Sequence, residues 1–325
     1  MSAHPTPPTV SRRRFFALAA GTCAALMTQC SRQHGLHRVS RSSKALGTTV
    51  TMTALHASEG KAGAALGAAL AELEHIESVM SIYRPESQLS QLNREGVLES
   101  PDSLLVEVLQ YAAEVAERSG GAFDITVQPL WKLKGAHPDA AAMALVDWRK
   151  VKVHAQRIQL APGMAITLNG IAQGFAADAA MRVMHAHGVE HALIDAGEFS
   201  ARGMNEEKAA WHIGIQHPRE RDAYAALTQL ENRCLATSGD YETAFSDDFS
   251  RHHILDPRTG QSPGELASVS VLAPTAMAAD ALSTALFVLG PQRGMKLLQG
   301  CPGTDALLIL KDGRHLATAG FPFAA

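Results

Sequence analysis

The sequence has 325 residues, of which 46% are hydrophobic and 19% charged, a composition that excludes a fibre or a largely disordered chain. The formal net charge is -3, so the chain lacks the cationic field that attracts a polyphosphate backbone. No run of Lys and Arg interleaves with aromatic residues, and nucleic acid is therefore not expected as a partner.

Residues 1–30 have the pattern of a twin-arginine export signal. The basic segment Ser11–Phe16 leads directly into the small, apolar run Ala17–Met27. This run is shorter than the roughly 20 residues that span a bilayer, so a membrane anchor is the weaker interpretation. We expect a periplasmic protein. Lipid attachment at Cys30 is not favoured, because Thr28 and Gln29 precede it where small residues are preferred.

After the signal, residues 31–44 are polar and basic, and we expect them to form a flexible linker to a single domain over residues 45–325. Only Cys234 and Cys301 fall inside this domain. An oxidising compartment permits a disulfide between them, and two buried free thiols are equally compatible with the sequence.

Hydrophobic periodicity predicts helices and strands in irregular alternation along the domain. Helices are expected at Lys61–Ile82, Ser103–Ser119, Gly174–His187 and Met277–Gly290. Strands are expected at Thr48–Leu55, Ala165–Leu168, His191–Asp195, Trp211–Gln216 and Leu266–Leu272. The order lacks the regular strand–helix repeat of a doubly wound sheet, so the predicted class is α+β.

Two oxygen-bearing residues lie one turn apart on the last predicted helix. Asp280 and Thr284 are at positions i and i+4, which places both side chains on one face. A carboxylate and a hydroxyl together suit a hard cation such as Mg²⁺. The same pair also has a purely structural interpretation, in which the Asp interacts with the helix dipole and the Thr bonds a backbone carbonyl.

Other segments carry polar or glycine-rich patterns. His252 and His253 precede a tight turn that closes at Gly260, and histidine can accept a proton near neutral pH. In Asn169–Gly174, two glycines allow the backbone to approach a phosphate or metal closely. Tyr83 could stack on a flavin or adenine ring, or simply end a helix.

In this order, the segments resemble the FAD:protein FMN transferase family, often called ApbE, from about Leu46 to Gly290. The motifs that carry the resemblance are Met80–Arg84 with Ser90–Asn93, Phe123–Leu130, Ser238–Tyr241, His253–Gly260 and Asp280–Ala285. The resemblance implies mixed sheets flanked by helices, in two lobes with the ligand site between them.

The resemblance also implies a reaction and a set of site residues. Mg²⁺ would be held by Asp280, Thr284 and the backbone carbonyl of Ala172, and it would bind the diphosphate of the substrate FAD. A Thr or Ser hydroxyl of an acceptor protein would attack the phosphorus on the FMN side, and AMP would leave. Catalytic roles fall to Asp280 and to His253, which would accept the hydroxyl proton. The implied cofactor-binding residues are Met80, Tyr83, Phe123, Asp124, Gly170, Gln173, Ser238, Asp240 and His253.

The sequence departs from the family pattern at Asn169, at Gln173 and at Ala196–Glu198, where charged or smaller residues are usual. The metal pair is intact, so these changes are expected to alter affinity or target choice rather than abolish activity. The expected acceptor is a flavoprotein of a membrane or periplasmic respiratory complex. Two alternatives stay open at this point, an FAD pyrophosphatase that uses water as the acceptor and a non-catalytic flavin-binding assembly factor.

Overall fold

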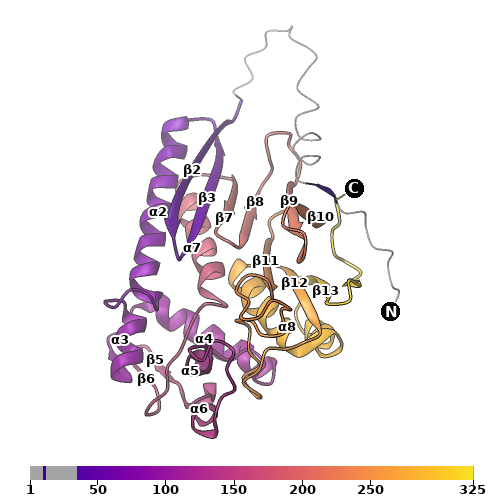
Figure 1. Ribbon diagram of the computed structural model, residues 1–325. Coiled ribbons are helices and arrows are strands. Elements are labelled where there is room, and N and C mark those ends of the chain that lie inside the picture. The colour runs from indigo at the N-terminus through magenta and orange to yellow at the C-terminus, as the bar shows by residue number, and fades with distance from the viewer. Residues whose placement is uncertain (1–9, 12–34, 325) are drawn as a thin grey trace.

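The centre of the molecule is an eight-stranded sheet in which every neighbouring pair of strands is antiparallel. The computed structural model describes residues 10–11 and 35–324 (Figure 1). The strand order is β14-β13-β12-β11-β8-β7-β3-β2. The strands are β2 (His37–Ala45), β3 (Thr48–His56), β7 (His191–Asp195), β8 (Phe199–Arg202), β11 (Cys234–Gly239), β12 (Leu266–Ala273), β13 (Asp305–Leu310) and β14 (His315–Ala317).

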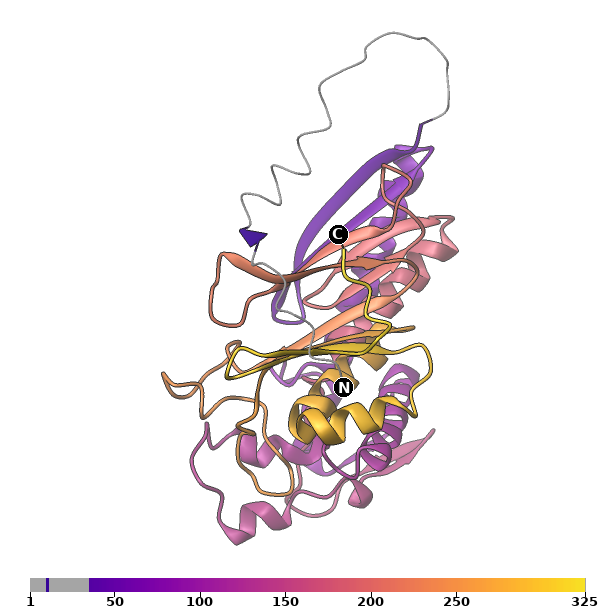
Figure 2. The same cartoon turned by 90° about the vertical axis from the view of Figure 1, so that its right-hand side faces the viewer.

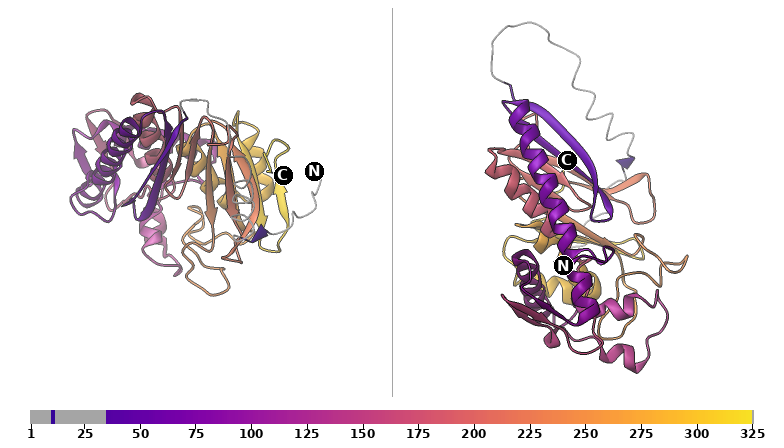
Figure 3. Two further views of the ribbon diagram at one scale, coloured as in Figure 1. Left: turned by 90° about the horizontal axis from the view of Figure 1, so that it is seen from above. Right: turned by 90° about the vertical axis from the view of Figure 1, so that its left-hand side faces the viewer.

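Three long helices pack against this sheet. The helix α2 (Glu59–Met80) contacts β2 and β3, α7 (Ala172–Ala186) contacts β7 and β8, and α8 (Ala276–Leu298) contacts β11 and β12. Figure 2 shows α8 on one side of β12 and β13, and Figure 3 shows α2 running from the β2–β3 hairpin towards the smaller helices. Because α7 lies between α2 and α8 and contacts both, the three helices form one layer.

A smaller sheet, of order β1-β10-β9, packs through a separate hydrophobic cluster. Its strands are β1 (Val10–Ser11), β10 (Ala223–Leu230) and β9 (Trp211–Gln216). Successive residues of β3 face opposite sides of the central sheet. Ala54 belongs to the hydrophobic cluster with the helices, and Leu55 belongs to the cluster with β9 and β10. At β3 the central sheet is therefore buried on both faces.

The remaining elements form the lower part of Figure 1. They are α3 (Gln88–Glu95), β4 (Val97–Glu99), α4 (Ser103–Arg118), the 3₁₀ turn η1 (Ile125–Val127), α5 (Gln128–Trp131), α6 (Ala140–Ala144), the 3₁₀ turn η2 (Trp148–Lys150), β5 (Lys152–His154) and β6 (Arg157–Gln159). Strands β4, β6 and β5 form a third small sheet. The α+β class is confirmed.

The flexible linker predicted for residues 31–44 is wrong over most of its length, because His37–Ala45 is strand β2. The strand is exposed on both sides, so its sequence lacks the apolar alternation of a half-buried strand. It is held by pairing with β3 along its whole length, including Ser–Thr hydroxyl bonds of 2.9 Å. Leu46 and Gly47 make the connecting turn with φ values of 52° and 77°, as a two-residue hairpin requires.

The strand predicted at Ala165–Leu168 is also wrong, because this buried segment pairs with no strand in the described part of the chain. Its backbone is bonded by a side chain instead of a neighbouring strand. Asn93 donates to the Ile166 carbonyl at 2.8 Å and accepts from the Ile166 amide at 2.7 Å. The Asn of the Ser90–Asn93 motif therefore supports the segment that leads into α7.

Other predictions agree with the structure. Strands β7 and β9 have the predicted bounds, and α7 and α8 begin within two residues of prediction. Gly290, with a φ of 73°, ends the regular part of α8, and a second helical stretch follows after this kink. Cys234 and Cys301 are buried free thiols. Within residues 10–11 and 35–324, no helix is long and apolar enough to cross a membrane. The predicted export signal lies outside the described residues, apart from Val10–Ser11.

Strand β2 gives the first testable prediction. A chain that begins at residue 46 should melt at a clearly lower temperature than one that begins at residue 36, because it lacks strand β2. The reason is that each lost ladder hydrogen bond contributes about 1 kcal/mol. Circular dichroism melting of the two chains makes the measurement. Equal melting temperatures would show that residues 37–45 behave as the linker originally expected.

Candidate functional site

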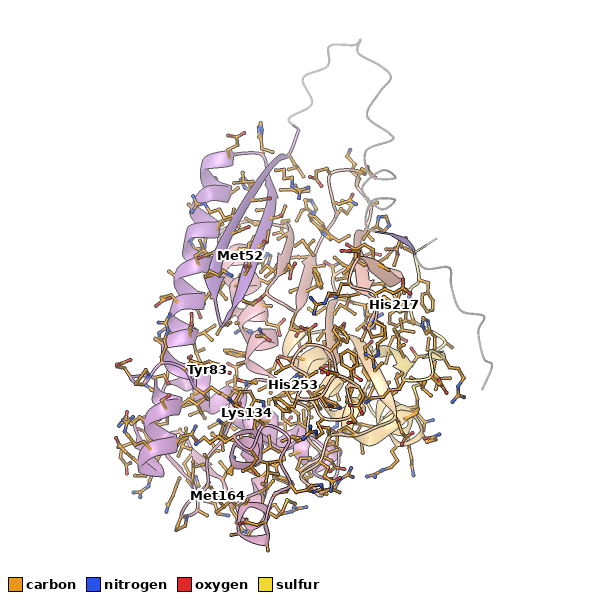
Figure 4. The ribbon with its side chains drawn as sticks, in the orientation of Figure 1. Met52, Tyr83, Lys134, Met164, His217 and His253 are labelled. Atoms are coloured by element: carbon orange, nitrogen blue, oxygen red, sulfur yellow. The ribbon has the colours of Figure 1, made fainter. Side chains whose placement is uncertain are left out.

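A cavity of about 340 Å³ opens where the first turns of α7 and α8 meet the end of β11 and two loops. Most of the residues that line it come from these segments. They include Phe123, Asp124, Trp131, Gly170, Gln173, Glu198, Thr237, Ser238, Glu242, His253, Leu255, Pro257, Asp280 and Thr284. Five of the predicted sequence motifs therefore contribute to one cavity although they are far apart in the chain. Figure 4 marks His253 near the middle of the molecule.

The first turns of α7 and α8 are in direct contact beneath this cavity. A Cβ atom added to Gly174 of α7 would lie 2.2 Å from the carbonyl oxygen of Ala276 in α8, so only glycine fits at this position. The Gly174 amide donates to Oδ2 of Asp280 at 3.0 Å. Among the described residues, no donor bonds Oδ1 of Asp280. The Asp280 carboxylate is therefore held by one oxygen, and the other stays available for a ligand.

Thr284 lies one turn along α8 from Asp280, as predicted. Its hydroxyl is 3.3 Å from that of Ser238, which in turn lies 2.7 Å from that of Ser283. A Cβ atom on Gly170 would lie 3.0 Å from Oγ1 of Thr284. The glycine therefore lets the segment before α7 come close to the hydroxyl. Both Asp280 and Thr284 line the cavity from one face of α8.

The cavity is acidic. Its lining contains Asp124, Glu198, Glu242 and Asp280, and no Lys or Arg among the described residues. Burial raises the pKa of all four carboxyls, that of Asp280 to about 7 and that of Glu198 well above its usual range. The charge of Asp280 adds to the rise at Glu198. The negative charge of these buried carboxylates is poorly balanced by other groups of the protein.

This donor set fits a hard divalent cation. Such a cation prefers carboxylate, hydroxyl and carbonyl oxygens, and it would compensate the charge that burial disfavours. The described residues contain no cluster of three or more His, Cys, Asp or Glu side chains arranged as a metal site. The predicted set differs from such a cluster, because it combines one carboxylate, one hydroxyl and one backbone carbonyl.

The two adjacent histidines have different environments. His252 is fully buried, donates from Nε2 to the Pro263 carbonyl at 3.2 Å and meets the ring of Phe287 edge-on. His253 lines the cavity, and its buried Nδ1 has no hydrogen-bond partner. Burial lowers the pKa of both, that of His252 to about 4. In both rings Nδ1 is unpaired and the lowered pKa favours the neutral form, but only His253 lines the cavity, where a proton acceptor must lie.

Asp124 and Phe123 also line the cavity, as predicted for cofactor-binding residues. Oδ1 of Asp124 accepts from the Thr126 amide at 2.8 Å and from the Thr126 hydroxyl at 2.6 Å. Oδ2 accepts from the Trp148 amide at 3.1 Å. The Asp124 carboxylate therefore joins two 3₁₀ turns and fixes the loop that presents Phe123.

The structure places four predicted site residues outside the cavity lining, namely Met80, Tyr83, Ala172 and Asp240. Met80 belongs to the hydrophobic core with 3% of its surface exposed, which corrects its assignment to cofactor binding. Tyr83 follows the end of α2 and is 69% exposed (Figure 4), so its role stays a prediction. Ala172 is the buried first residue of α7, between the cavity residues Gly170 and Gln173, and its role as a metal ligand also stays a prediction.

Asp240 is the clearest correction, because its carboxylate is fully buried away from the cavity lining. Arg219 binds both of its oxygens, at 2.7 and 2.8 Å, and Lys311 lies 3.4 Å from Oδ2. Arg219 also stacks over the ring of Phe249, and Lys311 donates to the Phe249 carbonyl at 2.6 Å. This network anchors the loop of residues 241–263, which carries His253. Asp240 supports the site and does not line it.

Glu198 and Glu242 were not predicted as site residues. Glu198 is almost fully buried and accepts from the Thr237 amide at 3.3 Å through Oε2. It follows the turn at Gly197, directly after β7. A carboxylate at the end of a predicted strand is a sequence signal that could have identified this residue. Glu242 lies two residues after Asp240. Strand β11 ends at Gly239, so strand alternation could not decide which of these two carboxylates faces the cavity.

The Asp240 network predicts a loss of stability. Arg219→Ala should lower the free energy of unfolding by about 3 kcal/mol, because it leaves a buried carboxylate with Lys311 as its single cation. It should also raise the KM for the ligand of the cavity, since the loop of His253 loses an anchor. Urea unfolding measures the first effect. Arg314→Ala, which breaks an exposed pair with Asp312, is the control and should change little. Equal stability of the two variants would contradict this role of the network.

Comparisons with known proteins agree with the motifs and the fold. Residues 46–308 match the ApbE family. The chain is 36% identical over 290 residues to the FAD:protein FMN transferase of Treponema pallidum, covering 79% of this chain and 80% of that one. It is 30% identical to a Klebsiella pneumoniae FAD:protein FMN transferase over 298 residues, covering 85% of each.

Solved structures of ApbE proteins also match the fold of this chain. The ApbE protein of Thermotoga maritima superimposes with a TM-score of 0.78 at 30% identity, covering 87% of this chain and 97% of that one. The flavin transferase ApbE of Vibrio cholerae gives a TM-score of 0.76 at 26% identity, covering 88% and 98%. With the family motifs assembled around one cavity, the chain belongs to the ApbE family and is a transferase.

Proposed function

We propose that this chain transfers FMN from FAD to a Thr or Ser hydroxyl of another protein, with Mg²⁺ bound and with release of AMP. One observation carries the proposal. Asp280, Thr284 and His253 line the same cavity, at the point where α7 begins. The relatives named above are FAD:protein FMN transferases, which supports the same substrate and the same transferred group for this chain.

Asp280 and Thr284 would hold Mg²⁺, with the backbone carbonyl of Ala172 as a third ligand. When bound, the ion would neutralise charge on the diphosphate of FAD and on the leaving AMP. The acidic lining supports this assignment, because a dianionic diphosphate would otherwise be repelled by Asp280 and Glu198. No basic side chain of the described lining performs that task.

The protein's own groups would orient the diphosphate and move the proton. The start of α7 lies at the cavity, and the partial positive charge of a helix N-terminus favours an anion there. The acceptor oxygen would form a bond to the phosphorus of the FMN half, while the bond from that phosphorus to the AMP oxygen breaks. The proton of the acceptor hydroxyl would pass to the neutral ring of His253.

Aromatic side chains support a flavin substrate. Phe123 and Trp131 line the cavity, and their rings would pack against the isoalloxazine or the adenine. Tyr83, which is exposed after the end of α2, would stack on a ring of bound FAD. A pyrophosphatase would use the same residues with water in place of the acceptor hydroxyl. A non-catalytic carrier would leave the unpaired Nδ1 of His253 without a role.

The acceptor is proposed to be a flavoprotein of a membrane or periplasmic respiratory complex. The support is the sequence of residues 1–30, which has the twin-arginine pattern. Export is tested in cells by replacing Arg12 and Arg13 with Lys. The proposal requires that the chain then accumulates inside the cell, and periplasmic recovery of the variant at the normal level would contradict it.

The transfer reaction is tested by mass spectrometry of a candidate acceptor incubated with the protein, FAD and Mg²⁺. The acceptor should gain the mass of FMN, and EDTA should abolish the gain. Asp280→Asn and Thr284→Val should each slow transfer by about 100-fold, because each removes a ligand that favours the charged transition state. Asp312→Asn, outside the cavity, is the control. AMP release without an acceptor mass gain would favour the pyrophosphatase, and FAD binding without AMP release would favour the carrier.

The role of His253 predicts a pH dependence. Burial lowers the pKa of His253 below 6.5, so its ring is neutral and able to accept a proton at pH 7. With Mg²⁺ at a saturating concentration, which keeps Asp280 ionised, the transfer rate should be constant above pH 6.5 and should fall as the pH drops through the lowered pKa of His253. His253→Asn should react about 100-fold more slowly and should lose this acid limb. His154→Asn, on exposed β5, serves as the control. An unchanged acid limb in His253→Asn would exclude His253 as the base.

A further inference from the structure

Helices α7 and α8 bind each other's first turns through carboxylates. Asp280 of α8 accepts from the Gly174 amide of α7, as described above. In the opposite direction, Asp178 of α7 accepts from the first two amides of α8, those of Ala276 at 2.8 Å and Met277 at 2.9 Å. The two contacts run in opposite directions between the same two helix ends.

Asp178 uses both carboxylate oxygens in this contact. Oδ1 binds the amide of Ala276, and Oδ2 binds that of Met277. Burial raises the Asp178 pKa, and the two amide bonds oppose that rise by favouring the charged form. Thr275, the N-cap of α8, accepts from the next amide, that of Ala278, at 3.2 Å. The first turn of α8 is therefore capped both by Thr275, which directly precedes the helix, and by Asp178 of α7.

These hydrogen bonds determine the position of α8 along the axis of α7. Each residue of an α-helix rises 1.5 Å, so a slide of one residue would break both bonds from Asp178. The same slide would move Asp280 away from Gly174 and Thr284 away from Gly170. The space between the two helices at Gly174 admits no side chain, since a Cβ atom there would lie 2.2 Å from the Ala276 carbonyl oxygen.

We propose that Asp178 is a positioning residue for the metal and diphosphate site, and that it acts by fixing α8 against α7 so that Asp280 and Thr284 face the cavity together. This rests on the proposed function, because the site it positions is the proposed Mg²⁺ site. Asp178 does not itself line the cavity and has no direct part in the reaction.

The alternative for Asp178 is an ordinary helix cap, which would stabilise the fold without affecting the site. Thr275 provides the matched comparison, because it caps the same turn of the same helix from outside α7. Removing either cap should lower the melting temperature. Only the loss of Asp178 should weaken metal binding.

The test is the binding of Mn²⁺ alone to the purified, folded protein, followed by electron paramagnetic resonance of the free ion. Asp178→Asn keeps a single acceptor oxygen, and it should weaken Mn²⁺ binding by about 10- to 100-fold. Thr275→Ala should melt at a lower temperature and keep the wild-type affinity. Wild-type affinity in Asp178→Asn, or an equal loss in Thr275→Ala, would overturn the positioning role. If the wild-type protein itself bound no Mn²⁺, the metal part of the proposed function would fail instead.

Hydrogen exchange of the wild-type protein gives a second test that does not depend on the folding of a variant. In the metal-free protein, the amides of Ala276 and Met277 should exchange as slowly as the buried strands of the central sheet, because Asp178 binds them before any metal arrives. Fast exchange of these amides without metal would mean that α8 is not fixed by Asp178, and it would overturn the proposal.

Discussion

The site depends on the contact between the first turns of α7 and α8, which Gly174 makes possible. A side chain at this position would collide with the Ala276 carbonyl, and α8 would have to move away. The contact lets a backbone amide of one helix bind the carboxylate of the other. It also brings the start of α7 to the cavity that Asp280 and Thr284 line. The packing of α7 against α8 and the geometry of the ligand site therefore depend on the same contact.

The charge of the cavity follows from this arrangement. Four carboxyls line it without a basic neighbour among the described lining residues, and burial raises the pKa of each. Such a cavity is poorly suited to an anionic ligand alone and well suited to an anion bound together with a divalent cation. The electrostatics thus support the metal–diphosphate pair of the proposed function.

The loop of residues 241–263 forms one part of the cavity lining, and a buried charge network around Asp240, directly after β11, holds it in place. Asp240, Arg219 and Lys311 form a buried network that holds Phe249 and, with it, the loop of His253. A loop needs such anchors because it has no ladder of backbone bonds to neighbouring strands. The motif Ser238–Tyr241 therefore contributes Ser238 and Gly239 to the cavity lining and Asp240 to the support of the loop.

The sequence by itself determined the features that depend on local geometry. Asp280 and Thr284 share a face because they are one helical turn apart, and the bounds of β7 and β9 followed from their apolar patterns. Tertiary structure alone decided the rest. Strand β2 exists because β3 pairs with it, and the segment before α7 has no strand partner among the residues that the structure describes because Asn93 binds the backbone of Ile166. Asp178, Asp240 and Glu198 are all acidic residues, and only contacts with residues distant in the chain assign them to capping, loop support and the cavity.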